Sequence, residues 1–72
     1  MNEVTKFMFY LFNRWDKSEA IQIFGDNLGR HIYGKWLWCR EHGADQLVWY
    51  AELDRECQNK LVARANEIYK DN

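Results

Sequence analysis

Residues 4–15, VTKFMFYLFNRW, carry the apolar pattern that decides the fold class. Apolar side chains recur there at the i, i+3, i+4, i+7 spacing of one helix face, at Val4, Phe7, Met8, Leu11, Phe12 and Trp15. Phe9 and Tyr10 fall outside this stripe. The pattern therefore predicts a helix over residues 3–15 with a wide apolar face, covered on two sides as the central helix of the fold.

Residues 18–24 are predicted to form a second, short helix. Ser18 can cap it, and its buried side chains would be Ala20, Ile21, Ile23 and Phe24. Gly25 then marks its C-terminal end. The alternative is one continuous helix over residues 18–42, with interior glycines at positions 25, 29 and 34 that are each about 1 kcal/mol less favourable than alanine. That penalty favours a break after residue 24.

A third helix is predicted over residues 27–42. Asp26 and Asn27 are its N-cap candidates, and Gly43 follows it as a C-cap. Its core stripe is expected at Leu28, Ile32, Trp36 and Cys39.

Two further helices are predicted in the C-terminal part of the chain. Asp45 can cap a segment over residues 45–52 in which nearly every side chain is apolar. A run of this length would also suit a buried strand, but the chain offers no second strand to pair with it. Asp54 can cap the last helix, over residues 55–70, whose core face would hold Cys57, Leu61, Ala65 and Ile68.

These segments predict an all-α fold, a compact irregular bundle of the orthogonal type with four to five short helices. The chain has 72 residues and is expected to form a single helical domain over residues 1–72. A domain this short buries only about 60% of the surface that its unfolded chain exposes, so its stability depends on dense packing or on a partner. Phe, Tyr and Trp make up 17% of the residues and supply large side chains to a small core.

Charge and composition argue against several classes of protein. The chain has 10 Lys and Arg against 11 Asp and Glu, so no overall field attracts it to nucleic acid or to anionic lipid. It shows no secretory leader and no apolar run long enough to span a membrane, so we expect a cytoplasmic location without a membrane partner. Cys39 and Cys57 are too few for a disulfide framework and are expected to be small buried hydrophobic residues.

The most suggestive surface lies on the helix predicted over residues 27–42. His31, Lys35, Trp38 and His42 fall within an arc of about 60° beside the core stripe, and Arg30 lies further around. Gly34 is on the same side and would let another backbone or ring approach. Either Trp38 packs beneath neighbouring helices, or it anchors a partner, since interface hot spots are rich in tryptophan and arginine. The candidate partner-binding residues, which we call the Trp38 surface, are Arg30, His31, Lys35, Trp38 and His42.

Catalytic and metal sites are not predicted. Cys39 and His42 have the i, i+3 spacing of half a zinc site or of a nucleophile and base, but no further ligand spacing matches a zinc motif and no third residue orients His42. Cys39 is expected to project into the core, and so short a chain has little room for a substrate cavity. Gly34 and Lys35 match the end of a phosphate-binding loop, but Trp36 stands where Ser or Thr is needed. We therefore expect no enzyme, no metal and no cofactor.

The preferred hypothesis is a small non-catalytic protein-interaction or regulatory accessory module that binds a protein partner, or a second copy of itself, through an aromatic surface. One small core has difficulty hiding so many large aromatic side chains, notably Trp38, Trp49 and Tyr50. The alternative is a nucleic-acid-binding accessory protein with Arg30, Lys35, Arg40 and Trp38 as its contacts. A helix-turn-helix is disfavoured, because aligning its turn glycine with position 25 or 29 places charged residues where the motif needs buried ones.

Overall fold

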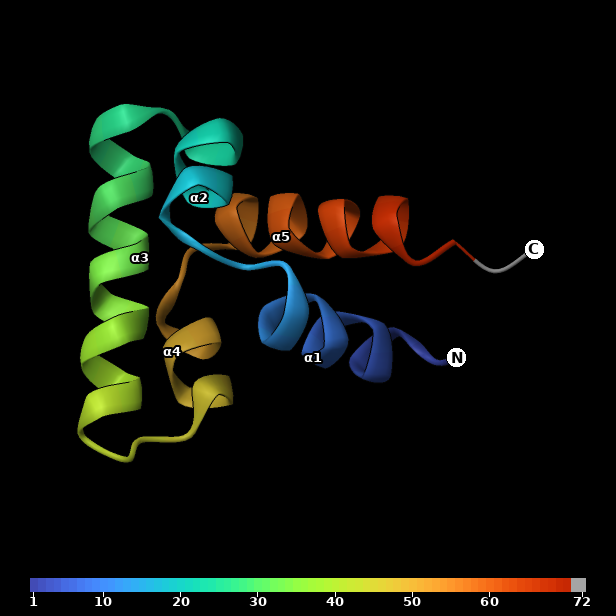
Figure 1. The fold of residues 1–72 in the computed structure, drawn as a ribbon, viewed down its shortest axis with the longest axis horizontal. Helices are drawn as coiled ribbons and strands as arrows, with labels where there is room; N and C mark the ends of the chain where they lie inside the picture. The colour runs from blue at the N-terminus through green and yellow to red at the C-terminus, as the bar shows by residue number, and fades with distance from the viewer. Residues whose placement is uncertain (71–72) are drawn as a thin grey trace.

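The computed structural model describes residues 1–70, and this part of the chain forms five helices and no strand. The helices are α1 (Glu3–Asn13), α2 (Lys17–Phe24), α3 (Asp26–Glu41), α4 (Gln46–Glu52) and α5 (Arg55–Ile68). In Figure 1, α3 stands upright at one side, and α1 and α5 extend away from it in a roughly perpendicular direction. The predicted fold class, an all-α bundle of short helices, is confirmed, and the apolar segment after Asp45 is a helix rather than a strand.

Side-chain caps set the starts of α1, α2, α4 and α5. The capping oxygens belong to Asn2, Asp16, Asp45 and Asp54, and each accepts a backbone N–H from the first turn of its helix. Asp45 and Asp54 are the predicted caps. The predicted cap at Ser18 was wrong, because Asp16 accepts the N–H of Glu19 and α2 therefore begins at Lys17.

Gly25 makes the break between α2 and α3. Its φ of +89° lies in the left-handed region, where the backbone of any residue with a side chain is strained. Gly25 serves as the C-cap of α2 and as the N-cap of α3. The single continuous helix over residues 18–42 is thereby excluded. The predicted N-caps at Asp26 and Asn27 were wrong, because both residues already lie inside α3.

α1 lies at the edge of the bundle, so its predicted central position was wrong. Phe7, Tyr10 and Leu11 are buried, whereas the predicted core positions Val4, Met8 and Phe12 are exposed. Tyr10 is enclosed although it was placed outside the core stripe, because its hydroxyl finds a partner in Glu19 at 2.9 Å. The spacing identified a helix but did not identify which edge of its wide apolar face turns inward.

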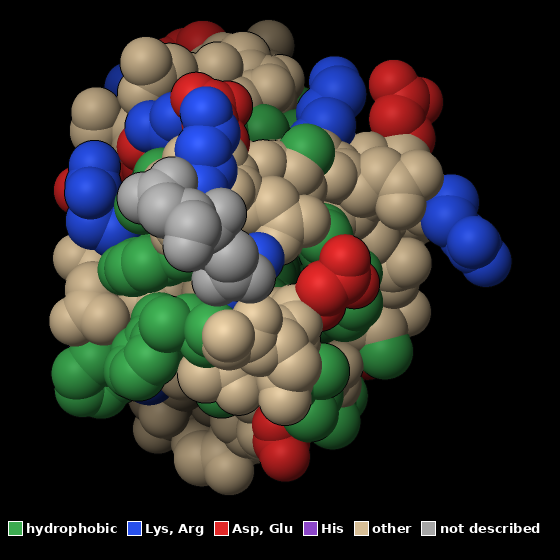
Figure 2. Space-filling view, turned by 90° about the vertical axis from the view of Figure 1, so that its right-hand side faces the viewer, with side chains coloured by type: hydrophobic (Ala, Val, Ile, Leu, Met, Phe, Trp, Pro, Cys, Tyr) green, Lys and Arg blue, Asp and Glu red, His purple; other side chains and the backbone are tan. Residues whose placement is uncertain are grey.

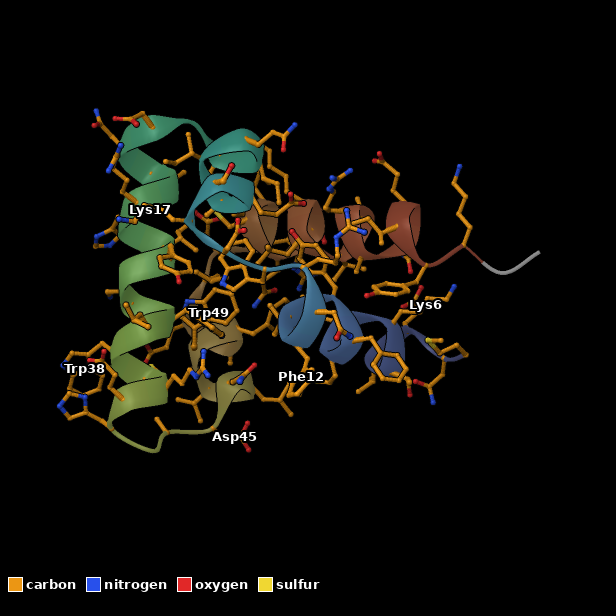
Figure 3. All side chains as sticks on the ribbon, in the orientation of Figure 1. Lys6, Phe12, Lys17, Trp38, Asp45 and Trp49 are labelled. Carbon is orange, nitrogen blue, oxygen red and sulfur yellow. The ribbon has the colours of Figure 1, made fainter. Side chains whose placement is uncertain are left out.

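Trp49 is the largest fully enclosed side chain of the core. Its indole N–H donates to the carbonyl of Ile32 at 3.2 Å, and its ring centroid lies 5.8 Å from that of Trp15. Figure 3 shows Trp49 in the interior, between α3 and α1. One tryptophan from the shortest helix therefore joins the long α3 to the segment that follows α1.

The buried face of α3 begins at Gly29 rather than at Leu28, which is exposed. Ile32 and Trp36 continue this face and are buried as predicted. A Cβ on Gly29 would lie 2.5 Å from the carbonyl oxygen of Ala20, so the missing side chain is what lets α2 and α3 touch. The sequence pattern assigned Leu28 instead of Gly29 to the buried face, because a glycine has no apolar side chain that would indicate burial.

The carboxylate of Glu19 links three helices. It accepts hydrogen bonds from the hydroxyl of Tyr10 in α1 and from the guanidinium of Arg64 in α5. Burial and the adjacent Glu19 raise the pKa of Tyr10 above its ordinary value, so the phenol stays protonated and continues to donate. These partners are 9 and 45 residues from Glu19 in the sequence, and no helical spacing predicts them.

Asp54 is expected to make the stability of the fold depend on pH. The N–H of Cys57 donates to Asp54 at 2.9 Å, and this hydrogen bond lowers the pKa of the carboxyl below its ordinary value. Because the folded pKa is the lower one, the stabilisation is complete above the unfolded pKa and disappears as the pH falls through the folded one. We expect the free energy of unfolding to decline below about pH 4, and Asp54→Asn to make that decline smaller. Urea unfolding at several pH values would measure the free energy of unfolding of the original chain and of Asp54→Asn. The same decline with falling pH in both would contradict the expectation.

Candidate partner-binding groove

An open groove of about 620 Å³ lies between α3 and the segment that contains α4. Its α3 side is formed by Arg30, His31, Gly34, Lys35, Trp38 and Cys39, and its other side by Ala44, Val48 and Glu52. The groove therefore brings together all but His42 of the Trp38 surface. The expectation that so short a chain has little room for a cavity of this size was wrong, because the groove lies between two helices at the surface and not within the core.

Trp38 is 57% exposed, so it does not pack beneath the neighbouring helices. In Figure 3 its side chain projects from α3 on the side away from α1. The imidazole of His42 stacks on the indole with ring centroids 3.9 Å apart and an angle of 14° between the planes. The Nδ1–H of His42 also donates to the carbonyl of Trp38 at 2.8 Å. His42 therefore lies beside the groove and covers one face of the indole, while the rest of the ring stays accessible.

The other large aromatic side chains considered for this surface are less accessible. Trp36 and Trp49 are buried, and Tyr50 is half-buried with its ring against Phe7. Trp49 in particular does not contribute to an aromatic surface. The accessible aromatic area of this region is therefore concentrated at Trp38.

Charges divide the two sides of the groove unequally. The cations Arg30 and Lys35 stand on the α3 side, and Glu52 stands on the α4 side. The guanidinium of Arg30 pairs with Asp26 one turn earlier at 3.0 Å, and both side chains are more than half exposed. Such an exposed pair contributes little to stability. The apolar side chains that line the groove are those of Trp38, Cys39, Ala44 and Val48.

Gly34 has no structural requirement for glycine. It lies inside α3, and a Cβ built on it would meet no atom within 4 Å apart from its chain neighbours and the backbone of its own helix, in contrast to Gly29. A glycine within a helix is about 0.5–1 kcal/mol less favourable than alanine. The fold is therefore less stable than it would be with alanine at position 34. This position lines the groove.

Cys39 is half-buried: it packs against the core, as predicted, and it also lines the groove, which was not predicted. Cys57 is buried as predicted, and burial raises the pKa of its thiol. The ring of His42 is held against Trp38 rather than directed at Cys39 as a base would be. Within residues 1–70, His, Cys, Asp and Glu side chains form no group of three that could hold a metal ion. In the same range, the helices are too short or too polar to cross a membrane.

The α4 side of the groove was not predicted. Leu47 and Val48 are about half exposed, and Val48 lines the groove. A signal for this exposure was present in the sequence, because nearly every residue from 47 to 51 is apolar. A helix that packs on one side of a small bundle cannot bury apolar side chains around its whole circumference, so some of them must face outward.

Comparison of the chain with models of protein families, with curated proteins and with solved structures found no match. The all-α class is set by the structure itself.

Proposed function

We propose that this chain is a non-catalytic protein-interaction module whose groove between α3 and α4 binds an acidic amphipathic helix of a partner protein. The observation that carries the proposal is the exposure of Trp38, an aromatic side chain held in place by His42 at the edge of an apolar groove. Aromatic anchors of this kind supply much of the energy of protein interfaces, because they lose little conformational freedom on binding.

The shape of the groove favours a helix as its occupant. From Arg30 to Trp38 the groove follows α3 for about 12 Å, which is the length of roughly two helical turns. A partner helix places apolar anchors at i, i+3 or i+4, and i+7 over that distance, as in other helix-in-groove complexes. Trp38 and Val48 would contact those anchors.

The charges of the groove favour an acidic partner. Arg30, His31 and Lys35 would face carboxylates along one edge of the bound helix, and Glu52 would face a cation on the other edge. Charge complementarity of this type fixes the direction of the partner and accelerates association. A basic partner helix would meet like charges along the α3 side.

Gly34 is explained by the same proposal. The partner helix can approach α3 closely where α3 has no side chain, so the lost helix stability is offset in the complex. Sites that a fold leaves suboptimal for stability are often retained for function.

The nucleic-acid alternative has less support from the contacts of the aromatic residues near Trp38. Trp36 is buried, and the guanidinium of Arg40 lies over its ring at 5.5 Å from the centroid. Tyr33 is half-buried and its ring contacts those of Trp15 and Trp36. Trp38 is then the accessible platform for a base, whereas binders of single strands stack successive bases on several rings.

Trp38→Ala is expected to remove binding and leave the fold intact. The probe is a synthetic amphipathic helix of about 14 residues with leucine anchors and flanking glutamates, and binding is followed by tryptophan fluorescence and by calorimetry. We expect the variant to bind at least about tenfold more weakly than the original chain, because the anchor is lost. Its thermal unfolding midpoint should stay close to that of the original chain, since an exposed side chain contributes little to stability.

Two further probes define the class of partner. The same peptide with lysine in place of each glutamate should bind at least about tenfold more weakly, and a single-stranded oligonucleotide should not bind at moderate salt. Equal binding of both peptides would overturn the acidic preference. Tight binding of the oligonucleotide with a steep salt dependence would instead support the nucleic-acid alternative.

A further inference from the structure

A second, smaller pocket adjoins the groove between α3 and α4. Its volume is about 150 Å³, and it shares His31, Lys35 and Glu52 with the groove. The rest of its lining comes from the first half of α3, the end of α4 and the start of α5, at Leu28, Ile32, Trp49, Leu53, Asp54 and Cys57. We call it the Leu28 pocket. It extends the groove towards the N-terminal end of α3, away from Trp38.

The Leu28 pocket has a largely apolar lining. Ile32, Trp49 and Cys57 are buried, whereas Leu28 is 45% exposed although it was expected in the core stripe. Hydrophobic side chains also gather in the lower half of Figure 2, on the face towards which α1 and α5 extend. The exposed apolar side chains of α1, however, line neither the groove nor the Leu28 pocket. Leu28 therefore differs from them in having a cavity beside it.

The volume of the Leu28 pocket suits one apolar side chain. A cavity of about 150 Å³ lined by aliphatic and aromatic side chains holds a benzene molecule, so a leucine or phenylalanine side chain has a comparable size. A whole helix with its side chains is about 10–12 Å across and needs the larger groove. The pocket can therefore receive a single side chain from a helix that lies in the groove.

Two charges of opposite sign stand where the groove meets the Leu28 pocket. Lys35 on α3 and Glu52 on α4 line both cavities. Within residues 1–70, neither of these side chains forms an ion pair, whereas Arg30 pairs with Asp26. A bound helix can therefore place a carboxylate opposite Lys35 and a cation opposite Glu52. These contacts would hold the helix at the mouth of the pocket.

The positions of Leu28 and Trp38 set a spacing for the partner. They are ten residues apart on α3, which is about 15 Å along the helix axis. On a partner helix, side chains at i and i+7 share a face but are only about 10.5 Å apart, whereas those at i and i+11 share a face and are about 16.5 Å apart. A partner helix that reaches both positions therefore needs apolar residues about three turns apart.

We propose that the Leu28 pocket receives an apolar side chain of the partner helix, eleven residues from the side chain that contacts Trp38. This inference rests on the proposed binding of an acidic helix in the groove. It defines the partner sequence more closely, as a helix of three turns with apolar residues at both ends and a carboxylate between them for Lys35. Leu28 is then a specificity-determining residue, because it selects the longer spacing.

A double-mutant cycle tests the contact. The probe is a synthetic helix of about 16 residues with leucines at i, i+4, i+7 and i+11 and flanking glutamates. Each terminal leucine is replaced by alanine in turn. One of the two replacements should weaken binding at least about fivefold in the original chain but less than about twofold in Leu28→Ala, because the contact is already lost there. Leu47→Ala is the matched control, since Leu47 is 48% exposed and lines neither cavity.

The indole N–H signals in a nuclear magnetic resonance spectrum report on the two cavities separately. Trp38 lines the groove and Trp49 lines the Leu28 pocket. The full peptide should shift both signals, whereas the peptide without the pocket leucine should shift only that of Trp38. Trp38→Phe and Trp49→Phe assign the two signals by their loss.

The outcomes distinguish this inference from the proposed function. Binding that depends on Trp38, with equal effects of each terminal leucine in the original chain and in Leu28→Ala and no shift of the Trp49 signal, would overturn the inference and leave the proposed function standing. Equally tight binding of a peptide that ends at the i+7 leucine would also overturn it. If the full peptide does not bind the original chain, the proposed function fails and the inference fails with it.

Discussion

Replacing Gly29 by alanine is expected to destabilise the fold by about 1–3 kcal/mol or more. The new methyl group would lie 2.5 Å from the carbonyl oxygen of Ala20 and 2.7 Å from the Cα of Ile21, and both atoms belong to the backbone. Backbone atoms cannot move aside as the end of a flexible side chain can, so α2 and α3 must separate. This change in the free energy of unfolding is opposite in sign to the usual effect of Gly→Ala inside a helix, which is stabilising by about 0.5–1 kcal/mol.

Gly34→Ala is the matched control, because it makes the same chemical change in the same helix. A Cβ there meets no atom of another helix or loop within 4 Å, so only the gain in helix propensity remains. Urea unfolding of both variants should give a lower free energy of unfolding for Gly29→Ala and a higher one for Gly34→Ala than for the original chain. Stabilisation by both substitutions would show that α2 and α3 do not pack as closely as described.

Trp49→Ala is expected to have the largest effect on stability, a loss of about 3–5 kcal/mol. The side chain is 1% exposed, and alanine would leave a cavity among Trp15 and the other core residues. It would also remove the indole N–H that donates to the carbonyl of Ile32. One core in a chain this short rarely supplies more than about 3–5 kcal/mol of net stability, so this variant is expected to be largely unfolded near 37 °C.

Trp49→Phe keeps the test informative where the alanine variant does not fold. Phenylalanine retains most of the apolar volume but cannot donate to the Ile32 carbonyl, so a smaller loss of stability is expected. The order of thermal midpoints should be the original chain, then Trp49→Phe, then Trp49→Ala. A midpoint of Trp49→Ala equal to that of Trp38→Ala would contradict the central position of Trp49 in the core.

The helical spacing in the sequence predicted the fold class and located all the described helices, because apolar periodicity and capping residues act within one helix. It could not predict which side of α1 turns inward, since that choice depends on contacts with distant residues. The Glu19 link between Tyr10 and Arg64 is one such contact. The contact made by Gly29 could not be predicted for a similar reason, because it exists only when α2 lies against α3.

The candidate site was predicted in part. Helical geometry was enough to place Arg30, His31, Lys35 and Trp38 on one side of a helix, and these residues do line the groove. The α4 side was missed because no pattern within residues 27–42 indicates which later segment packs beside them. The exposure of Trp38 could not be derived either, since burial depends on where the neighbouring helices end.

Binding of the acidic peptide by Gly34→Leu tests the proposed groove most directly. Leucine is a good helix former, and position 34 has open space around its Cβ, so the free energy of unfolding should be equal to or above that of the original chain. The same side chain would occupy the groove beside Trp38 and Lys35, so the affinity for the peptide should fall at least about tenfold. Undiminished peptide binding by this stably folded variant would contradict the proposal that the partner lies in the groove between α3 and α4.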